Sequence, residues 1–351
     1  MSVLFAILIF SVLIFVHEFG HFAAAKLSGV QVNEFAMFMG PAIWKKQKGE
    51  TLYSIRCIPI GGYCAMEGED EDTDNPRSFQ KAAWWKRLII LVAGAAMNFL
   101  FGILVFAVLY LPGDVVTAPV ISEFTDCCIF NNQEGLQLGD EILEIDGEKI
   151  YIQGDVGMLL GLDDDGIHDI VVLRDGERLE FDDLLMGHTH LDENGEVYRH
   201  YGITFGEVRE ADFLDKLQYV WNITIDNVRN VRLSLGMLLS GKAGLKDMTG
   251  PVGLVDMMAD TAKQSEDALT AFLNMLYFGG FIAINLGVMN LLPIPALDGG
   301  RVVCLLITTA VEAVTKKKID PKYEGYLHGA GMILLLGLMA IIMFKDIWNL
   351  F

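Results

Sequence analysis

The sequence predicts a polytopic α-helical membrane protein with about four transmembrane helices, a membrane-associated β-hairpin and an inserted β-rich domain. Three observations predict this class. Of the 351 residues, 52% are hydrophobic, and the mean hydropathy of +0.39 is too high for a soluble protein of this length. Long apolar stretches recur at about the 20 residues that a helix needs to cross a bilayer. Acidic residues are concentrated in one segment of the chain.

The charge distribution separates the apolar body from the insert. Residues 112–215 hold 26 acidic and 5 basic side chains, whereas the rest of the chain is almost neutral. The segment is therefore expected to be a water-soluble insert in an apolar body. The net charge of −20 excludes a nucleic-acid-binding protein, which needs basic side chains to neutralise phosphates.

Four apolar stretches are expected to span the membrane. No basic residue precedes the first stretch, as one would in a cleaved signal peptide, so it is interpreted as a helix that stays in the protein. The third stretch continues irregularly to residue 310. The expected spans are residues 1–25, 88–111, 272–292 and 332–344.

Between the first two spans, residues 32–44 and 51–60 are rich in β-branched and aromatic side chains and flank the turn Lys48-Gly49. They predict a β-hairpin that ends at Pro59 and the pair Gly61-Gly62. A hairpin this apolar must lie against the membrane or the helical body. Its edge around residues 54–58 is expected to hold an extended peptide.

Asp-Gly turns at Asp146-Gly147 and Asp175-Gly176 separate short strand-like runs in the insert, which indicates one small β-rich domain. Apolar residues recur at helical spacing over 213–239, so an amphipathic helix is expected there, either on the outer membrane surface or packed on the β-rich domain. The expected divisions are 1–111 (first two spans and hairpin), 112–208 (insert), 209–268 (surface helix and linker) and 269–351 (last two spans).

Lysine and arginine predict the orientation. Lys45, Lys46 and Lys48 lie between spans one and two, and Lys316 and Lys317 lie between spans three and four. Basic loops face the cytoplasm, and four spans place these two loops on the same side. The insert and both termini are then expected outside the cytoplasm.

The motif His17-Glu18-Phe19-Gly20-His21 is an HExxH sequence. On a helix, histidines four residues apart share a face and can bind one zinc ion, with the glutamate beside the bound water as general base. Ionisable groups in an apolar helix are costly unless they face a protein interior or a water-filled site. The motif therefore predicts a metal centre rather than histidines at the membrane interface, which is the alternative.

A catalytic zinc site needs a third protein ligand. The best candidate is Asp298 in the segment NLLPIPALDGG, where prolines and glycines open the helix. The alternative for this segment is a loop between two helices, with Asp298 as the N-cap. His328 is the main competing ligand. The histidines of the insert, at positions 168, 188, 190 and 200, are expected across the membrane from the motif.

HEFGH in the first span, NLLPIPALDGG in the third and GLQLGDEI in the insert together resemble the site-2 protease family of intramembrane zinc metalloproteases, in its regulator of sigma-E protease branch. The resemblance covers almost the whole chain. It implies one zinc ion held by His17, His21 and Asp298, with Glu18 as the catalytic general base. It also implies substrate-binding roles for Asn98, Asn290, Gly61 and Gly62. For the two asparagines, the alternative role is hydrogen bonding between helices inside the membrane.

The same resemblance implies a PDZ-like domain in the insert, which either binds a peptide or only excludes bulky substrates. It further implies a multi-pass protein of the bacterial inner membrane, with the active site toward the cytoplasm and the PDZ-like domain outside. Expected substrates are single-span membrane proteins shortened on their outer side, such as anti-sigma factors or remnant signal peptides, cleaved within or near their transmembrane segment.

Two other classes of protein remain as alternatives. A metal transporter also uses intramembrane histidine and aspartate, but it needs neither a PDZ-like domain nor a general base. A catalytically dead adaptor would use only the insert and has no need of Glu18. The adjacent Cys127 and Cys128 fit no disulfide framework or zinc-ligand pair and carry no prediction.

Overall fold

The structure is a computed structural model. It describes residues 2–69, 71, 73–124, 135–162, 166–186, 188–191, 197–244, 246–317, 319–320 and 322–349, so Cys127 and Cys128 lie outside the described residues. The chain forms two compact units. Unit 1 contains residues 1–105 and 227–351, and unit 2 contains residues 106–226. The insert expected at 112–208 lies inside unit 2.

Four helices among the described residues are long and apolar enough to cross a membrane: α1 (Ser2–Ser28), α2 (Trp84–Tyr110), α6 (Ala268–Asn290) and α8 (Lys322–Asn349). The last is longer than the span expected at 332–344. Glu324, His328 and Lys345 interrupt the apolar run there, but they do not interrupt the helical backbone.

The expected continuation of the third span is wrong in detail. Residues 291–297 form a loop, and a separate helix α7 (Asp298–Thr315) follows it. Two prolines in this loop remove backbone N–H donors, so α6 ends at Asn290. The alternative expected from the sequence, a loop between two helices, is therefore present, although Leu297 rather than Asp298 is the N-cap residue.

Small residues allow the helices of unit 1 to pack closely. A Cβ atom at Gly20 of α1 would lie 2.4 Å from the carbonyl oxygen of Ala93 in α2. One at Gly287 of α6 would lie 3.0 Å from the carbonyl oxygen of Ala95 in α2. Such contacts are typical of helices in membranes, where van der Waals packing replaces the hydrophobic effect. They bring the middle of α2 against both α1 and α6.

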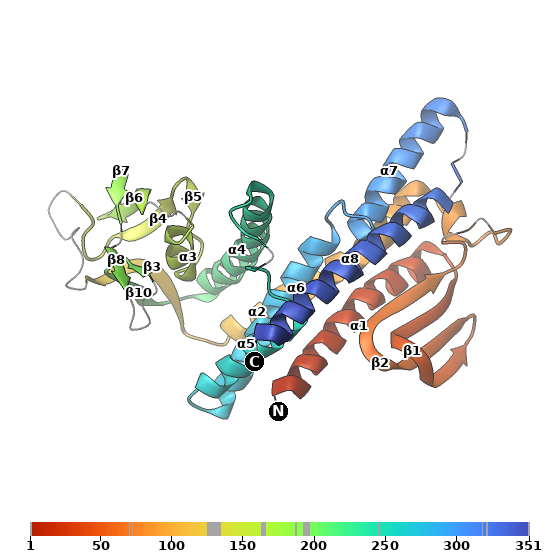
Figure 1. The fold of residues 1–351 in the computed structure, drawn as a ribbon, viewed down its shortest axis with the longest axis horizontal. Helices are drawn as coiled ribbons and strands as arrows, with labels where there is room; N and C mark the ends of the chain where they lie inside the picture. Colours follow the sequence, from red (N-terminus) through yellow and green to blue (C-terminus); the bar gives the residue numbers. More distant parts are fainter. Residues whose placement is uncertain are drawn as a thin grey trace. The chain divides into compact units, whose positions relative to one another are not determined.

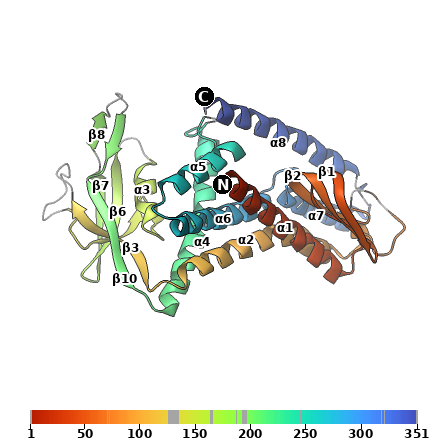
Figure 2. The same cartoon turned by 90° about the horizontal axis from the view of Figure 1, so that it is seen from below.

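The hairpin consists of β1 (Val32–Lys48) and β2 (Thr51–Met66), joined by a two-residue turn at Gly49 and Glu50. Phe15 and Phe22 of α1 pack against Phe35 of β1, so the hairpin lies beside the C-terminal half of α1 (Figure 1 and Figure 2). It is therefore attached to the helix that carries the HExxH motif.

The hairpin is longer than expected, and β1 pairs with β2 on both of its edges. β2 does not end at Pro59 and Gly61-Gly62 but continues to Met66. Residues 34–37 of β1 pair with residues 52–55 on one edge and with residues 62–65 on the other. Residues 54 and 55 are also paired on both edges, so the edge expected at 54–58 is closed there. Among the described strands, the outer edge of residues 62–65 has no partner.

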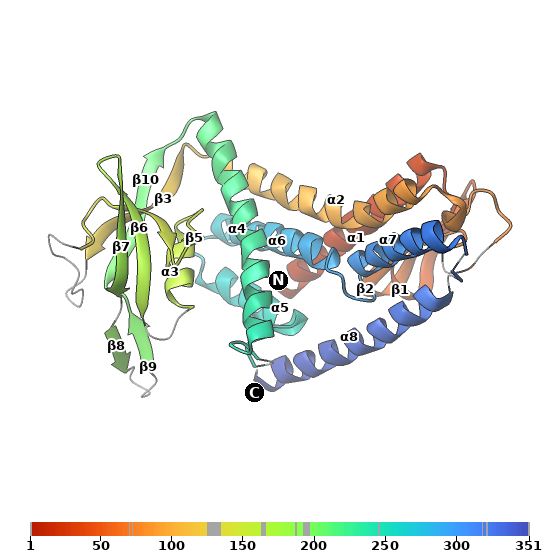
Figure 3. The ribbon, with the colours of Figure 1, turned by 90° about the horizontal axis from the view of Figure 1, so that it is seen from above.

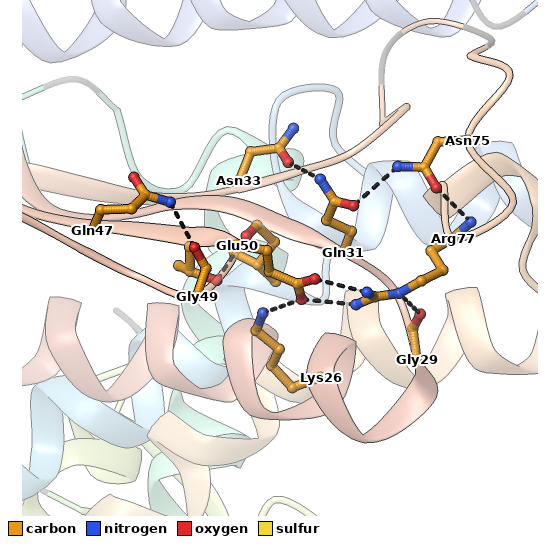
Figure 4. Close-up of polar contacts among 11 residues, drawn as sticks. Lys26, Gly29, Gln31, Asn33, Gln47, Gly49, Glu50, Asn75 and Arg77 are labelled. Carbon is orange, nitrogen blue, oxygen red and sulfur yellow. Dashed lines mark hydrogen bonds and ion pairs between the residues drawn. The ribbon is translucent and has the colours of Figure 1, made fainter.

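A polar cluster ties the turn of the hairpin to both neighbouring segments (Figure 4). Glu50 accepts hydrogen bonds from Lys26 at the end of α1, at 2.6 Å, and from Arg77 in the segment before α2, at 2.7 Å. Arg77 also donates to the carbonyl of Gly29. The two hydrogen bonds from Arg77 form the bidentate pair that arginine makes with carboxylates. The cluster fixes where the hairpin leaves and re-enters the helical body.

Unit 2 is built on an antiparallel sheet with the strand order β10-β3-β4-β6-β7, with β5 paired to β4 and the short helix α3 beside it (Figure 3). Asp140 of the GLQLGDEI motif is fully buried and forms an ion pair with Arg174 at 2.7 Å. The motif thus has a structural role in holding its own loop. The elements are β3 (Val115–Phe124), β4 (Glu141–Ile145), β5 (Glu148–Lys149), α3 (Gly154–Leu160), β6 (Ile167–Arg174), β7 (Glu177–Leu185), β8 (His188–Leu191), β9 (Val197–His200) and β10 (Ile203–Glu210).

Two further helices connect the insert to the third span. The helix expected at 213–239 is α4 (Phe213–Ser240), whose first half packs in unit 2 through Tyr219, Thr117 and Tyr110. Helix α5 (Pro251–Gln264) belongs to unit 1 and packs against α1 and α6. A 3-10 turn, η1 (Phe79–Lys81), precedes α2.

Candidate metal centre

Three potential metal ligands converge between α1 and α7. His17 and His21 lie on one face of α1, and their Nε2 atoms are 3.3 Å apart. The Oδ2 atom of Asp298 lies 3.4 Å from Nε2 of His17 and 3.3 Å from Nε2 of His21. All three side chains are largely buried, with 10–18% of each side chain exposed. Among the described residues this is the group of His, Cys, Asp and Glu side chains close enough to hold a metal ion.

The spacing of these atoms fits zinc. Ligand bonds of about 2.0–2.1 Å at tetrahedral angles place two ligand atoms about 3.3–3.4 Å apart. All three observed distances fall at this value. Asp298 Oδ2 is buried and makes no hydrogen bond of good geometry, although two imidazole nitrogens lie beside it. A cation among the three atoms would satisfy this oxygen, so the residues fit a zinc ion.

The second nitrogen of His21 is oriented by α2. Its Nδ1 lies 2.8 Å from the carbonyl oxygen of Ile90. A carbonyl can only accept, so Nδ1 carries the proton and Nε2 has a free lone pair. Histidines that bind metals commonly donate their other N–H in this way. The backbone of α2 therefore sets the tautomer that zinc requires.

A side chain of α2, that of Asn98, lies beside His17. The Nδ2 atom of the Asn98 carboxamide lies 3.4 Å from Nδ1 of His17, and the Asn98 side chain is almost fully buried. When Nε2 faces a metal, Nδ1 carries the proton, and the carboxamide oxygen is the matching acceptor. As the carboxamide stands, its oxygen has no hydrogen-bond partner, and a half turn of the amide would bring this oxygen to the place of Nδ2 beside His17. Asn98 thus contacts the metal centre from behind His17.

Gly94 provides the space for the His21 ring. A Cβ atom at this position would lie 2.2 Å from Nε2 of His21, far inside any allowed contact. Gly94 lies four residues after Ile90 and four before Asn98, so one face of α2 carries the three groups that contact the two histidines.

Glu18 faces the hairpin. A Cβ atom at Gly62 of β2 would lie 3.2 Å from Cγ of Glu18, and the backbone of Cys64 faces the carboxylate. The outer edge of residues 62–65, which no described strand covers, therefore runs beside the candidate general base. A peptide that pairs with this edge would pass close to Glu18 and the metal site.

Asp298 is placed by the loop at residues 291–297. It is the first residue of α7, and the N-terminal turn of this helix packs tightly on the loop, since a Cβ atom at Gly299 would lie 2.2 Å from the carbonyl oxygen of Leu291. One turn further along α7, Arg301 forms an ion pair with Glu69, which follows the hairpin. The loop and this ion pair fix α7 against the rest of unit 1.

Three further residues that the sequence singled out are not among the converging ligands. Asn290 is the last residue of α6, and its half-buried side chain makes no hydrogen bond within the described residues. His328 is not among the three converging ligands, because its Nδ1 accepts a hydrogen bond from the backbone of Ala296. His168 is buried in unit 2 and lies 2.7 Å from Asp146.

Sequence reasoning missed Gly94 and the contacts of His328. A glycine in an apolar span has no chemistry of its own, and only its spacing from Asn98 could have indicated that it faces the same neighbour. The hydrogen bond from Ala296 to His328 joins residues 32 positions apart, which no local pattern reveals.

The chain is similar to known zinc metalloproteases. The model of the family described as peptidase family M50 matches residues 5–338. A protein of Clostridium perfringens named as a zinc metalloprotease is 35% identical over 348 residues, which cover 99% of this chain and 98% of that protein. A similarly named protein of Fusobacterium nucleatum is 34% identical over the full length of both chains. The regulator of sigma-W protease RasP of Bacillus subtilis is 27% identical over 100% of this chain and 99% of its own.

Proposed function

The chain belongs to peptidase family M50 and is a zinc metalloprotease, and from this premise we propose that it cleaves single-span membrane proteins within or near their transmembrane segments. The observation that carries the proposal is the set of three ligand atoms at tetrahedral spacing, with a glutamate between the two histidines, on a helix apolar enough to span a membrane.

In this proposal His17, His21 and Asp298 hold one zinc ion. When bound, zinc polarises a carbonyl group and lowers the pKa of water toward about 7. Glu18 takes a proton from the attacking water and transfers it to the leaving amine. Asn98 and the carbonyl of Ile90 keep the two imidazole rings in the orientation that the site needs.

We place the substrate on the outer edge of residues 62–65 rather than at residues 54–58. A helical substrate shields its peptide bonds, so it must unwind before cleavage. Pairing with a strand edge holds a peptide extended. Gly61 directly precedes this edge and Gly62 begins it, and the small Gly62 leaves room next to Glu18. Only the family resemblance assigns a substrate-binding role to Asn290.

Substrate class and orientation follow the resemblance and the charge pattern. The expected substrates are anti-sigma factors or remnant signal peptides already shortened on their outer side. Both basic loops are placed in the cytoplasm of a bacterial cell, which puts unit 2 outside the inner membrane. There the PDZ-like domain either binds a peptide ligand or excludes substrates with intact outer domains.

The test is cleavage of a single-span substrate in proteoliposomes by the wild type and by Glu18→Gln. The glutamine variant keeps the shape of the side chain but cannot take up the proton, so it should bind zinc and lose at least about 100-fold in turnover. Equal cleavage by the two proteins would contradict the role of Glu18. Zinc transport into the liposomes by both proteins would favour the transporter instead.

A further inference from the structure

The loop that presents Asp298 depends on another helix for one of its backbone hydrogen bonds. Within the loop, Ile294 N–H donates to the carbonyl of Leu292 at 2.7 Å, and Leu297 N–H donates to the carbonyl of Ile294 at 3.2 Å. The N–H of Ala296 donates instead to Nδ1 of His328 in α8, at 2.9 Å. Ala296 also has a φ of +81°, a left-handed conformation that alanine rarely adopts. An external contact therefore helps to hold the loop in a conformation that its own sequence disfavours.

Packing makes this contact specific. A Cβ atom at Gly331, three residues after His328 on α8, would lie 2.6 Å from the side chain of Pro295. On the other side, a Cβ atom at Gly300 of α7 would lie 2.3 Å from the carbonyl oxygen of Ile294. The loop is thus held between the first turn of α7 and one face of α8, and the imidazole of His328 is buried against it.

The hydrogen bond fixes the state of the imidazole. A backbone N–H can only donate, so Nδ1 of His328 must accept with its lone pair. The neutral ring then carries its proton on Nε2, so neither nitrogen offers a free lone pair to a metal, in agreement with the absence of His328 from the three converging ligands.

We propose that His328 is a positioning residue for the metal centre: by accepting the Ala296 N–H it fixes the backbone two residues before Asp298 and so sets where the Asp298 carboxylate points. The proposal rests on the ligand set given above. Groups that orient a metal ligand commonly contribute about 10–100-fold to metal affinity. His328 reaches the ligand through the backbone rather than through the ligand's own side chain.

Asparagine and glutamine at position 328 form a matched pair. The Oδ1 atom of asparagine lies close to where Nδ1 of histidine lies, whereas the amide of glutamine reaches toward the place of Nε2. Both are polar and of similar size. A role that needs only a buried polar side chain would not distinguish them. Ala296 and His328 line a cavity of about 650 Å³, which leaves room for the altered side chains, so the variants are expected to fold.

The experiment measures zinc affinity by chelator competition on the full-length protein in detergent, for wild type, His328→Asn, His328→Gln and Asp298→Ala, with a Tm for each. We expect His328→Asn to stay within about 3-fold of wild type and His328→Gln to lose about 10-fold or more. Wild-type affinity in both His328 variants, or loss in the asparagine variant with retention in the glutamine variant, would overturn the proposal. If Asp298→Ala keeps wild-type affinity, the ligand assignment itself fails, which is a separate result.

Discussion

At the scale of single residues, the proposed metal centre depends on two features of α2, the side chain of Asn98 and the lack of a side chain at Gly94. His21 Nε2 has room to face the metal only because position 94 carries no Cβ atom. Nδ1 of His17 lies beside the carboxamide of Asn98, and Nδ1 of His21 lies beside the carbonyl oxygen of Ile90, both in α2. In the proposed metal centre, the HExxH motif supplies two ligands and α2 supplies their orientation.

Gly94→Ala should weaken zinc binding. The new methyl group would lie 2.2 Å from Nε2 of His21, so the ring must leave its position and the ligand is lost. We expect zinc affinity to fall more than about 10-fold. Chelator competition measures it. Gly337→Ala in α8 is the matched control, because nothing lies within 4 Å of a Cβ atom there. Full zinc occupancy in Gly94→Ala would show that His21 binds no metal in this position.

Asn98 allows a graded test of ligand orientation. Asn98→Asp keeps an oxygen to accept the proton on His17 Nδ1, so zinc affinity should stay near that of wild type. Asn98→Leu removes the acceptor and should weaken zinc about 10–100-fold. Equal zinc affinity in the two variants would leave Asn98 with the substrate contact that the family resemblance implies.

Several residues of this site can be predicted from the sequence, and others cannot. His17, Glu18 and His21 are neighbours on one helix turn, so their spacing alone brings them together. Asp298 is 277 positions after His21, and only its unusual surroundings of prolines and glycines point to it. Gly94 and His328 act through contacts that exist only after α2 and α8 have packed.

At the scale of elements, the attachment of the hairpin has a pH dependence. Hydrogen bonds from Arg77 and Lys26 hold the pKa of Glu50 at about 2, below its usual value of 4.5. The carboxylate therefore stabilises the fold above pH 4.5, and this contribution is lost as the pH falls toward 2.

Glu50→Gln should lower the Tm at pH 7 by about 1–3 °C, a small effect because the three side chains are partly exposed. Thermal unfolding of wild type and variant in detergent measures the difference, which should shrink as the pH is lowered from 5 to 3. Glu266→Gln, an exposed position, is the control. A difference that stays constant over this pH range would contradict the assigned pKa.

The C-terminal end of α8 is attached to the start of α5 by Asp346. Its buried carboxylate accepts hydrogen bonds from the N–H groups of Gly250 and Gly253, at 2.9 and 3.0 Å. Asp346→Ala leaves these donors without an acceptor and should destabilise the protein by about 1–3 kcal/mol. Asp346→Asn keeps one acceptor and should lose less. The check is the Tm of both variants, and an unchanged Tm for Asp346→Ala would show that the contact adds no stability.

Element boundaries differ from expectation where tertiary contacts override local signals. Pro59 and Gly61-Gly62 are typical strand-ending residues, yet β2 continues. Its last part pairs with the edge of β1 that residues 52–55 leave open. The opposite holds in the third span, where the apolar pattern runs on past Asn290 but the prolines end α6.

At the scale of the whole molecule, segments far apart in the sequence are proposed to form one zinc centre in a membrane protein. The chain is a zinc metalloprotease of peptidase family M50, and four of its described helices are long and apolar enough to cross a membrane. The fold class can be predicted from the composition and the apolar runs, because both are visible in the sequence without knowledge of tertiary contacts. The pairing of α1 with α7 does not, because it depends on how the loop at residues 291–297 turns back.

The most direct test of this claim is the zinc content of the detergent-purified protein beside His17→Ala and Asp298→Ala. The structure predicts about one zinc per wild-type chain and a sharp loss of affinity in both variants, since removing either one leaves only two ligands. A folded wild type that binds no zinc even when the metal is supplied, or an Asp298→Ala variant that binds it as tightly as wild type, would contradict the centre between α1 and α7.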